Sequence, residues 1–523
     1  MKKKLLAVLM TGVMAMSMLT GCGNSEDAEV SENTAAGSEQ VSSEAGTEAV
    51  NNGEITDITF YMADIAGIGN ENADHVEEAL NEITEEKIGV HVDLNLIEAG
   101  DFTTQVNLAI TSNDKMDLCM IMPLAASGMS AMVSNNQLME LNDLLDEYGQ
   151  GIKDAMGQYL DAGRIGDSYY EIPTYRLYSS DLAIVMRKDI LEELNMVEKA
   201  ENMTTWAEFE EILAAVADNY DIAPIGGANG AVFVNDVVYM CGDNLSDAVT
   251  FDTLGSQAFF LSTDDNGNVY SLTGTDDFKN AQSRVKKWWD NGWVYKDNPT
   301  TTEQNTSLMK QNLVFSVTNT VELGAEASWL ANTGYEVVIK EIVPNSVTNQ
   351  HVNKFGMGIP ITAEEPEAAM KFANLMYTDA DVMNLLDWGV EGTDYVMKDG
   401  EADYPDGVST DNVSYHNKDF LMGNYFLAAP WAGNGYGADF RSVAEEELKK
   451  APVSPYLGFN ADTSELTNEI AAVTNVMNEY INNIRSGAFD DAMYDEFQSA
   501  LNEAGMQKIV DTYQQQLNEW LGK

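Results

Sequence analysis

Residues 90–96 read Val-His-Val-Asp-Leu-Asn-Leu, a stretch in which apolar and polar side chains alternate at every position. This period of two is typical of a strand with one buried face. Apolar patterns also predict strands at 55–63 and 118–122, and helical periodicity predicts helices at about 72–87 and 101–111. The resulting order of strand, helix, strand, helix and strand predicts an α/β fold whose mostly parallel sheet is covered on both faces.

Helix signals continue to the end of the chain. Thr205-Trp206-Ala207-Glu208 is a capping box that predicts a helix to about residue 218, and a second helix is expected over 275–291. Pro366 is expected near the first position of a helix that ends near residue 377. Three more helices are predicted at about 462–486, 489–503 and 505–521.

The composition excludes some classes of partner. The chain has 523 residues, with 85 Asp and Glu against 28 Lys and Arg, and its formal charge is −57. A length of this size allows roughly two to four domains, and 44% hydrophobic residues indicate a folded body. Nucleic acid and anionic lipid are both recognised by clustered basic residues, so we expect neither to be bound by charge.

The N-terminus has the features of an export signal. Three lysines precede an apolar run over 5–19, which has the length of a signal peptide and is too short for an ordinary membrane-spanning helix. The run ends in Leu-Thr-Gly-Cys, which resembles the lipobox of bacterial lipoproteins. We therefore expect 1–21 to be cleaved and Cys22 to carry acyl chains that anchor the protein to the membrane. Residues 22–53 are expected to form a disordered acidic tether.

The sequence offers little support for catalysis or metal binding. Cys119 lies in an apolar run and is expected in a buried strand, and its pairing with Cys241 stays open. The four histidines are scattered, and neither H-E-x-x-H nor G-x-S-x-G occurs. Residues 264–268 resemble the start of a calcium loop, although a hairpin with an Asn-Gly turn fits better. We therefore expect no catalytic residue, no metal and no cofactor.

Several motifs after residue 54 occur in a specific order. They are Tyr170-Glu171-Ile172-Pro173-Thr174, Met186-Arg187-Lys188-Asp189-Ile190-Leu191, Gly358-Ile359-Pro360 with residues 365–372, residues 385–395 (LLDWGVEGTDY), Leu457-Gly458-Phe459, and residues 469–473 and 514–520. Together they resemble the extracellular solute-binding proteins of ABC importers, in the large carbohydrate-binding lipoprotein branch with a C-terminal helical domain. Trp388 is the chief departure, since Tyr is common at this position of the family motif.

The resemblance implies a periplasmic-binding-protein-like type II fold, with two α/β lobes around a hinge and a ligand cleft between them. Lobe one would hold 54–180 and 312–355. Lobe two would hold 181–311 and 356–523, including a C-terminal helical region at about 455–523. Closure of the lobes about the hinge would trap the ligand, and ligands of such sheets gather beyond the carboxyl ends of the strands.

A sugar presents flat apolar faces ringed by hydroxyl groups, so its site needs aromatic platforms and planar hydrogen-bonding side chains. Such residues occur after predicted strands and in glycine-rich loops. The candidates are Tyr61, Asp64, Tyr175, Arg176, Tyr178, Trp388, Glu391, Tyr395, Trp431, Asn434 and Tyr436. Each also has a structural interpretation: Tyr61 could be an ordinary strand residue, and Arg176 could pair with a structural acid. Trp288 and Trp289 lie within a predicted helix and are excluded.

The resemblance implies a monomeric, lipid-anchored binding protein on the extracellular face of the membrane. It would capture a carbohydrate, expected to be an oligosaccharide, and deliver it to the transmembrane permease subunits of an ABC transporter. Three alternatives stay open. The protein could be an anchored exo-enzyme such as a glycosidase or peptidase, a binding protein for peptides or another non-sugar solute, or a receptor subunit that binds another surface protein.

Overall fold

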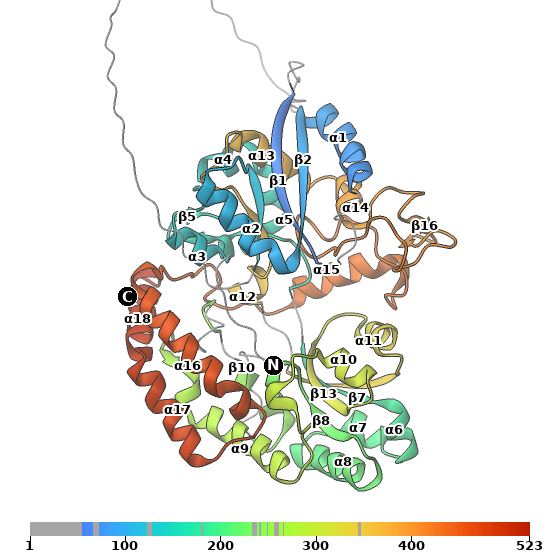
Figure 1. The fold of residues 1–523 in the computed structure, drawn as a ribbon, viewed down its shortest axis with the longest axis vertical. Helices are drawn as coiled ribbons and strands as arrows, with labels where there is room; N and C mark the ends of the chain where they lie inside the picture. Colours follow the sequence, from blue (N-terminus) through green and yellow to red (C-terminus); the bar gives the residue numbers. More distant parts are fainter. Residues whose placement is uncertain are drawn as a thin grey trace, which may run out of the picture. The chain divides into compact units, whose positions relative to one another are not determined.

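A first sheet joins strands from three distant parts of the chain (Figure 1). Its order is β2 (Val90–Glu98), β1 (Thr56–Asp64), β3 (Leu118–Ile121), β15 (Gly356–Gly358) and β6 (Ile172–Pro173). β1 is parallel to β2 and β3, whereas β15 is antiparallel to β3 and β6. The carboxyl ends of β1, β2, β3 and β6 therefore lie along one side of the sheet, which we call the carboxyl edge.

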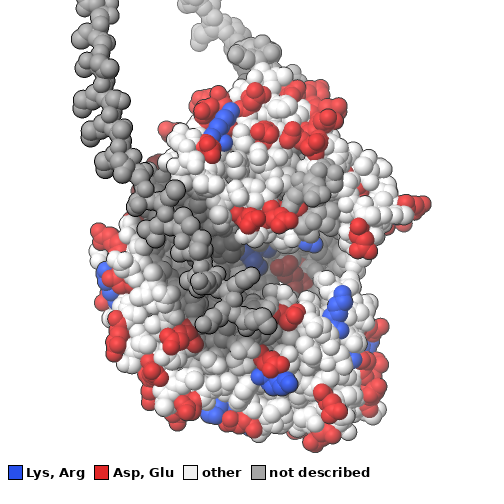
Figure 2. All heavy atoms as spheres, viewed as in Figure 1, with Lys and Arg blue, Asp and Glu red and all other residues white. Residues whose placement is uncertain are grey.

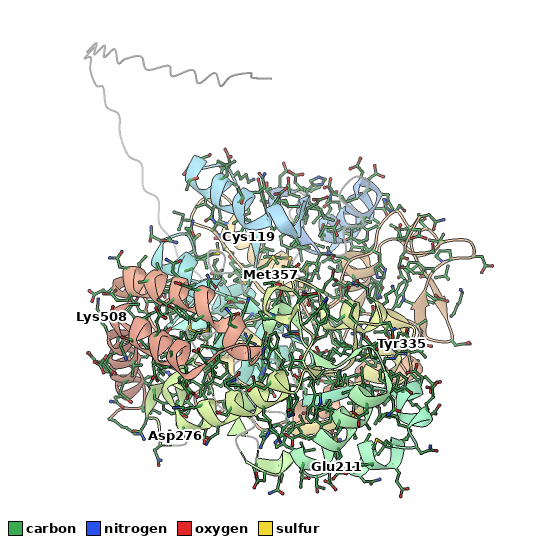
Figure 3. The ribbon with its side chains drawn as sticks, turned by 60° about the horizontal axis from the view of Figure 1, so that its bottom comes forward. Cys119, Glu211, Asp276, Tyr335, Met357 and Lys508 are labelled. Atoms are coloured by element: carbon green, nitrogen blue, oxygen red, sulfur yellow. The ribbon has the colours of Figure 1, made fainter. Side chains whose placement is uncertain are left out.

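The computed structural model describes residues 55–65, 73–122, 128–178, 181–232, 238–239, 242–247, 249–250, 252–255, 261–264, 266–343 and 347–523. The predicted signal peptide (1–21), the predicted acylation site Cys22, the predicted tether (22–53) and Cys241 lie outside these residues. Within them, none of the helices combines the length and the apolar character needed to cross a membrane. Cys119 is fully buried in β3, as predicted, beside the strand that carries Met357 (Figure 3).

A second sheet has the order β14 (Val337–Val343), β7 (Asp181–Arg187), β13 (Val314–Val321) and β8 (Ala223–Gly226). β13 is parallel to β8, and β7 is antiparallel to both β13 and β14. The carboxyl ends of β8, β13 and β14 consequently share one edge. Glu322, which follows β13 directly, lies at this edge.

Helices pack on the first sheet because alternate residues of its strands are apolar and buried, such as Ile58, Phe60 and Met62 of β1. The crossover helices are α1 (Asp74–Ile88), between β1 and β2, and α2 (Ala99–Ser112), between β2 and β3. On the Phe60 face, α13 (Pro366–Leu375) packs its Phe372 ring against Phe60 with the ring centroids 5.8 Å apart. Pro366 occupies the start of α13, as predicted.

The other elements complete the two sheet-based bodies. The helices are α3 (Met129–Ser134), α4 (Asn142–Tyr148), α5 (Gln150–Met156), α6 (Lys188–Glu193), α7 (Val197–Asn202), α8 (Trp206–Asn219), α9 (Asp276–Asp290), α10 (Asn305–Lys310), α11 (Ala325–Thr333), α12 (Asn349–Val352), α14 (Ala380–Trp388) and α15 (Phe440–Lys450). The hairpins are β4 (Arg164–Ile165) with β5 (Ser168–Tyr169), β9 (Val238–Tyr239) with β10 (Val249–Thr250), β11 (Leu261–Thr263) with β12 (Val269–Ser271), and β16 (Val396–Lys398) with β17 (Glu401–Asp403).

The C-terminal region is a set of three helices, α16 (Thr467–Arg485), α17 (Asp491–Glu503) and α18 (Met506–Trp520), close to the predicted positions. Their apolar faces share a core with β11, β12 and α9. The Trp520 ring packs against Phe459 at a centroid distance of 6.0 Å, and this contact joins the end of the chain to the segment that enters the region.

The segments assigned to each lobe differ from those expected. The second sheet contains β13 and β14, although 312–355 was expected in lobe one, and the first sheet contains β15, although 356–523 was expected in lobe two. The family motifs identify the fold but carry no information about which distant strands pair. We use lobe one for the first sheet with residues 347–450 and lobe two for the second sheet with its helices, in keeping with their separate cores.

Candidate functional site

The segment after α14 covers the carboxyl edge beside β1. The Asn417 side chain donates a hydrogen bond to the carbonyl oxygen of Ala63 (3.4 Å), and its backbone N–H donates to the carbonyl oxygen of Asp387 (2.8 Å). The Tyr415 hydroxyl donates to the carbonyl oxygen of Leu386 (2.7 Å). These bonds fix residues 415–417 next to Asp64, the buried last residue of β1.

Asp387 and His416 are buried polar groups at this edge. Asp387 is 1% exposed, and among the described residues neither of its carboxylate oxygens has a hydrogen-bond partner. Burial raises the pKa of Asp387 well above its usual range; nearby Asp419 adds to this effect and Arg441 opposes it. Burial, together with Lys418, lowers the pKa of His416 to about 4. His416 is therefore a neutral imidazole at pH 7, and a protonated Asp387 is favoured over its ionised form.

Aromatic side chains gather beside these groups, and we call Trp388, Tyr395, Tyr404, His416 and Trp431 the aromatic cluster. The Trp431 ring lies 4.9 Å from Trp388, 4.8 Å from Tyr404 and 4.5 Å from His416, measured between centroids. Trp388 is 3% exposed, and its indole N–H donates to the carbonyl oxygen of Ala429. Trp431 and Tyr404 are only partly buried and supply the accessible ring surface.

A short backbone pairing positions Trp431. The Ala402 N–H donates to the carbonyl oxygen of Pro430, and the Ala432 N–H donates to that of Ala402, both at 2.8 Å. The chain on either side of Trp431 is thereby attached to β17. Since Tyr404 follows β17 directly, this pairing also brings the two accessible rings together.

The glycine-rich loop after Trp431 reaches lobe two. Asn434 donates to the carbonyl oxygens of Trp431 and Gly437 and to the Glu401 carboxylate, so its side chain holds the loop together. A Cβ atom placed on Gly324, just before α11, would lie less than 3.0 Å from the Asn434 carbonyl oxygen. The loop that carries Trp431 is therefore also a contact between the lobes.

Charged groups from both lobes meet between the two carboxyl edges. Glu322 is solvent-accessible but closely surrounded by protein; this desolvation raises the pKa of its carboxyl, while Arg176 and Lys354 act in the opposite direction. Because Arg176 and Lys354 lie at the carboxyl edge of lobe one and Glu322 at that of lobe two, the two edges face each other. Figure 2 shows a hollow on this side of the molecule with basic and acidic atoms inside it.

Asp419 and Arg441 form an ion pair at 2.6 Å in the same region. The Arg441 guanidinium lies 3.7 Å from the centroid of the Tyr425 ring, and its Nε donates to the carbonyl oxygen of Ala428. This buried arginine connects α15 to the segment that bears Asp419. Its charge is compensated within lobe one.

The structure divides the predicted site residues into groups. Trp388, Tyr395 and Trp431 come together in the aromatic cluster, and Asn434 and Tyr436 lie in the adjoining loop, where Tyr436 is 46% exposed. Asp64 and Arg176 lie at the carboxyl edge. Glu391 is exposed, and its backbone forms an isolated β-bridge with Tyr395.

Three predicted tyrosines belong instead to lobe one's core or pack on it. The Tyr178 ring is 2% exposed, and its hydroxyl donates to the carbonyl oxygen of Thr174. Tyr175 is buried between Tyr159 and Phe426. Tyr61 lies within β1, partly buried, and burial together with Asp114 and Asp93 raises the pKa of its hydroxyl. The rings of Tyr175 and Tyr178 stabilise the core of lobe one and are not accessible platforms, whereas Tyr61 stays partly accessible on β1.

Sequence reasoning missed several residues of this region. Tyr404 precedes a proline and could have been recognised as a loop aromatic, and Asp387 is adjacent to Trp388 within a family motif. His416, Lys354 and Glu322 have no local signal, because only the tertiary fold brings them to the carboxyl edges.

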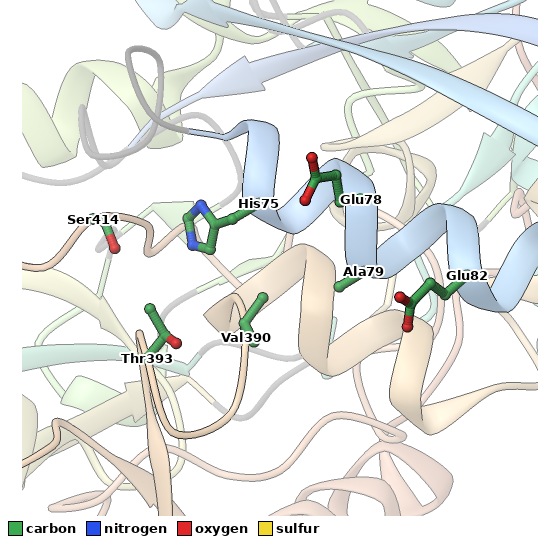
Figure 4. Close-up of a pocket in the computed structure, with 7 residues that line it drawn as sticks. All are labelled: His75, Glu78, Ala79, Glu82, Val390, Thr393 and Ser414. Atoms are coloured by element: carbon green, nitrogen blue, oxygen red, sulfur yellow. The ribbon is translucent and has the colours of Figure 1, made fainter.

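A separate pocket of about 320 Å³ lies on the outside of lobe one, between α1 and the loop after α14 (Figure 4). There His75 Nε2 lies 2.7 Å from Asp394, and the Ser414 hydroxyl donates to the other oxygen of the same carboxylate at 2.5 Å. In a Ser-His-Asp triad the histidine stands between serine and aspartate. Here the Asp394 carboxylate lies between Ser414 and His75, so the serine hydroxyl has no histidine base beside it. The three residues instead connect the loop to α1.

The residues expected to form a hairpin at 264–268 do so. The Asp264 carboxylate accepts the backbone N–H groups of Asn266 (2.8 Å) and Asn268 (3.0 Å), and the Asn268 side chain donates to it as well. These bonds lower the pKa of Asp264. Among the described residues, no group of three or more His, Cys, Asp or Glu side chains could hold a metal ion.

Comparison with known proteins gives two family matches. A family described as bacterial extracellular solute-binding protein matches residues 69–383, and a domain of unknown function matches residues 455–522. A carbohydrate ABC transporter substrate-binding protein of Streptococcus pneumoniae serotype 4 is 21% identical over 458 residues, which cover 86% of this chain and 89% of that protein.

Solved structures of the N-glycan transport solute binding protein (NgtS) from Streptococcus pneumoniae are also similar. One has a TM-score of 0.74 at 19% identity and covers 90% of this chain and 99% of that chain. A complex with Man1GlcNAc has a TM-score of 0.69 at 20% identity, covering 90% of this chain and 100% of that chain. These likenesses confirm the predicted fold class, two α/β lobes of the periplasmic-binding-protein type.

Proposed function

Since the chain belongs to the bacterial extracellular solute-binding protein family, as its motifs predicted, we propose that it captures an oligosaccharide for an ABC importer. The match covers the strands of the second sheet and those of the first sheet except β1. The protein would hold its ligand between the lobes and release it unchanged to the permease subunits.

The observation that carries this proposal is the aromatic cluster at the carboxyl edge. Trp431 and Tyr404 offer accessible ring faces, and the apolar C–H face of a sugar ring packs well on such a surface. Trp388 and His416 support them from behind. Asp387 and His416, which lie beside this platform, favour their uncharged forms. The combination suits an uncharged surface rich in hydroxyl groups, as sugars have.

The polar groups next to the platform support the same ligand class. Asp387, His416 and Asn417 each keep at least one buried oxygen or nitrogen without a hydrogen-bond partner among the described residues. Together with Asp64 and Arg176 they supply donors and acceptors near β1. We propose that closure of the lobes brings sugar hydroxyl groups within reach of this set, with the loop at Asn434 and Tyr436 closing one side.

Similar proteins support a carbohydrate over a peptide. The relative from Streptococcus pneumoniae is described as a carbohydrate transporter component, and the similar NgtS structures include complexes with Man1GlcNAc and Man5GlcNAc. We propose that this chain also binds a carbohydrate of more than one sugar unit. Anchoring through Cys22 on the extracellular face, action as a monomer and delivery to an ABC permease are parts of the same proposal, and the lipobox supports the anchor.

A thermal-shift screen of the purified body with Man5GlcNAc, other oligosaccharides and peptides tests the proposal. A ligand at a hundred times its Kd stabilises the folded state by about 2.7 kcal/mol, so a true oligosaccharide ligand raises Tm measurably. A response to peptides without a response to any oligosaccharide would contradict it. Chromatography of the oligosaccharide after incubation separates binding from catalysis, because an exo-enzyme would release shorter products.

A further inference from the structure

Lys354 occupies a defined place at the carboxyl edge of lobe one. It lies between α12 and β15, and the next residue, Phe355, accepts a hydrogen bond from the backbone N–H of Thr174 at 2.9 Å. The Arg176 side chain donates to the carbonyl oxygen of His351 at 3.1 Å. Two basic residues from different segments are thus held side by side where the chain passes between the lobes.

The Lys354 residue is exposed and forms no ion pair within the described part of the chain, although desolvation by the surrounding protein and the nearby Arg176 lower its pKa. Lysines on the outer surface of this acidic protein commonly do: Lys188 lies 2.7 Å from Glu336, and Lys508 lies 2.7 Å from Glu469. With 85 acidic residues in the chain, an acid close to an exposed lysine is the ordinary outcome. Lys354 makes no such pair, and the nearby carboxyl with which it interacts electrostatically is that of Glu322.

The local balance of charge is positive. Arg441 and Asp419 compensate each other as an ion pair, and buried Asp387 favours its neutral form. Two cations, Arg176 and Lys354, then face the single carboxyl of Glu322, whose ionised form is disfavoured by its surroundings. This local excess of basic groups contrasts with the formal charge of −57 for the whole chain.

We propose that Lys354 binds a carboxylate group of the captured oligosaccharide, so that the preferred ligand contains an acidic sugar such as a uronic or sialic acid. This inference rests on the proposed function. The ammonium would donate a charge-assisted hydrogen bond to the carboxylate, and such bonds are roughly twice as strong as neutral ones. Arg176, whose guanidinium is held by the carbonyl oxygens of Leu177 and His351, would add a favourable field without direct contact.

Matched pairs of probes test the inference. Calorimetric titrations would compare sialylated N-glycans and oligogalacturonates with the same compounds converted to neutral methyl esters. We expect at least one acidic compound to bind about tenfold or more tightly than its ester, as a hydrogen bond to a charged group implies. We also expect this preference to shrink at high salt, because the site is exposed.

Three variants assign the effect to one side chain. Lys354→Gln should abolish the preference for the acidic member but bind the neutral ester as the wild type does, which excludes a folding defect as the cause. Lys354→Arg should retain the preference. Lys310→Gln is the matched control: Lys310 is likewise exposed and without an ion pair among the described residues, but it ends α10 at the opposite side of the second sheet. It should keep the full preference.

The outcomes separate the two proposals. Equal or tighter binding of every neutral ester, or an unchanged preference in Lys354→Gln, would overturn the acidic-sugar inference while leaving oligosaccharide capture intact. Absence of binding to all oligosaccharides, acidic and neutral, would overturn the proposed function, and the inference with it.

Discussion

Gly324 of lobe two and Asn434 of lobe one touch through their backbones, so closely that a Cβ atom on Gly324 would lie less than 3.0 Å from the Asn434 carbonyl oxygen. Gly324 also has a φ of 78°, a conformation that glycine adopts readily and other residues rarely do. Because the Asn434 loop begins at Trp431, the contact between the lobes and the aromatic platform belong to one segment.

Gly324→Ala should therefore weaken ligand binding by forcing the loop away from α11. Gly334, at the other end of α11, provides the control: its φ is 79° and nothing lies within 4 Å of its added Cβ. Both alanine variants should lose about 1 kcal/mol of unfolding free energy from the backbone conformation. Only Gly324→Ala should also lose oligosaccharide affinity in calorimetric titration. Equal affinities in the two variants would show that the contact has no part in binding.

Trp431→Ala should lower oligosaccharide affinity with little loss of stability. Removing one packed aromatic face costs about 2 kcal/mol of binding free energy, or about thirtyfold in Kd. Trp388→Ala should instead lower the free energy of unfolding by about 3–5 kcal/mol, since its indole is buried. Trp289→Ala, in α9 of lobe two, is the control for losing a partly buried tryptophan, and its affinity should be unchanged. Titration and chemical denaturation measure the two quantities.

His416→Gln should make the protein less sensitive to mild acid. The pKa of His416 is about 4 in the folded protein and about 6.5 in the unfolded chain, so the unfolded state binds more protons between these values. The free energy of unfolding then falls as pH drops from 6.5 to 4, by up to about 3 kcal/mol from this residue. Denaturation at pH 7 and 4.5 should show a smaller drop in His416→Gln than in the wild type. Equal drops in the two proteins would contradict this role of His416.

Asp387→Asn should stabilise the protein at pH 8. Burial raises the pKa of Asp387, so the stability that its protonated form provides is present below the unfolded pKa and lost as pH rises through the folded value. The Asn side chain of the variant stays uncharged at every pH, so the variant does not lose this free energy of unfolding as pH rises. Denaturation at pH 8 checks the sign.

The same substitution at Asp117 should have the opposite effect. The buried Asp117 carboxylate accepts the backbone N–H groups of Thr59, Glu364 and Glu365 at 2.8–2.9 Å. In Asp117→Asn the amide nitrogen would face one of these donors, which should cost about 1–3 kcal/mol. A loss of stability in both variants would show that the Asp387 carboxylate is satisfied in the folded state.

Cys22→Ser should release the protein from the membrane, because the acyl chains expected at this cysteine would have no attachment point. Fractionation of cells followed by detection of the protein measures its distribution. The variant should move to the soluble fraction, whereas Ser25→Ala should stay with the membrane. A membrane-bound Cys22→Ser variant would mean that another segment provides the anchor.

The sequence by itself determined the elements whose stabilising contacts are local. The capping box at Thr205 forms as predicted, with the Glu208 N–H donating to the Thr205 hydroxyl oxygen and the Glu208 carboxylate accepting the Thr205 N–H. The alternation at 90–96 matches a strand paired with β1 along its length. The motifs identified the family, and the family match over residues 69–383 confirms it.

Only the tertiary structure decided which strands pair and which aromatic rings stay accessible. β15 lies in the first sheet because it pairs with β3, which is more than 200 residues away in the sequence. Tyr178 resembles Trp431 as a loop aromatic, yet it is buried against Tyr159 while Trp431 meets Tyr404 and His416. Whether a ring is buried and which strands pair depend on residues that are distant in the sequence. A local sequence pattern therefore cannot predict either.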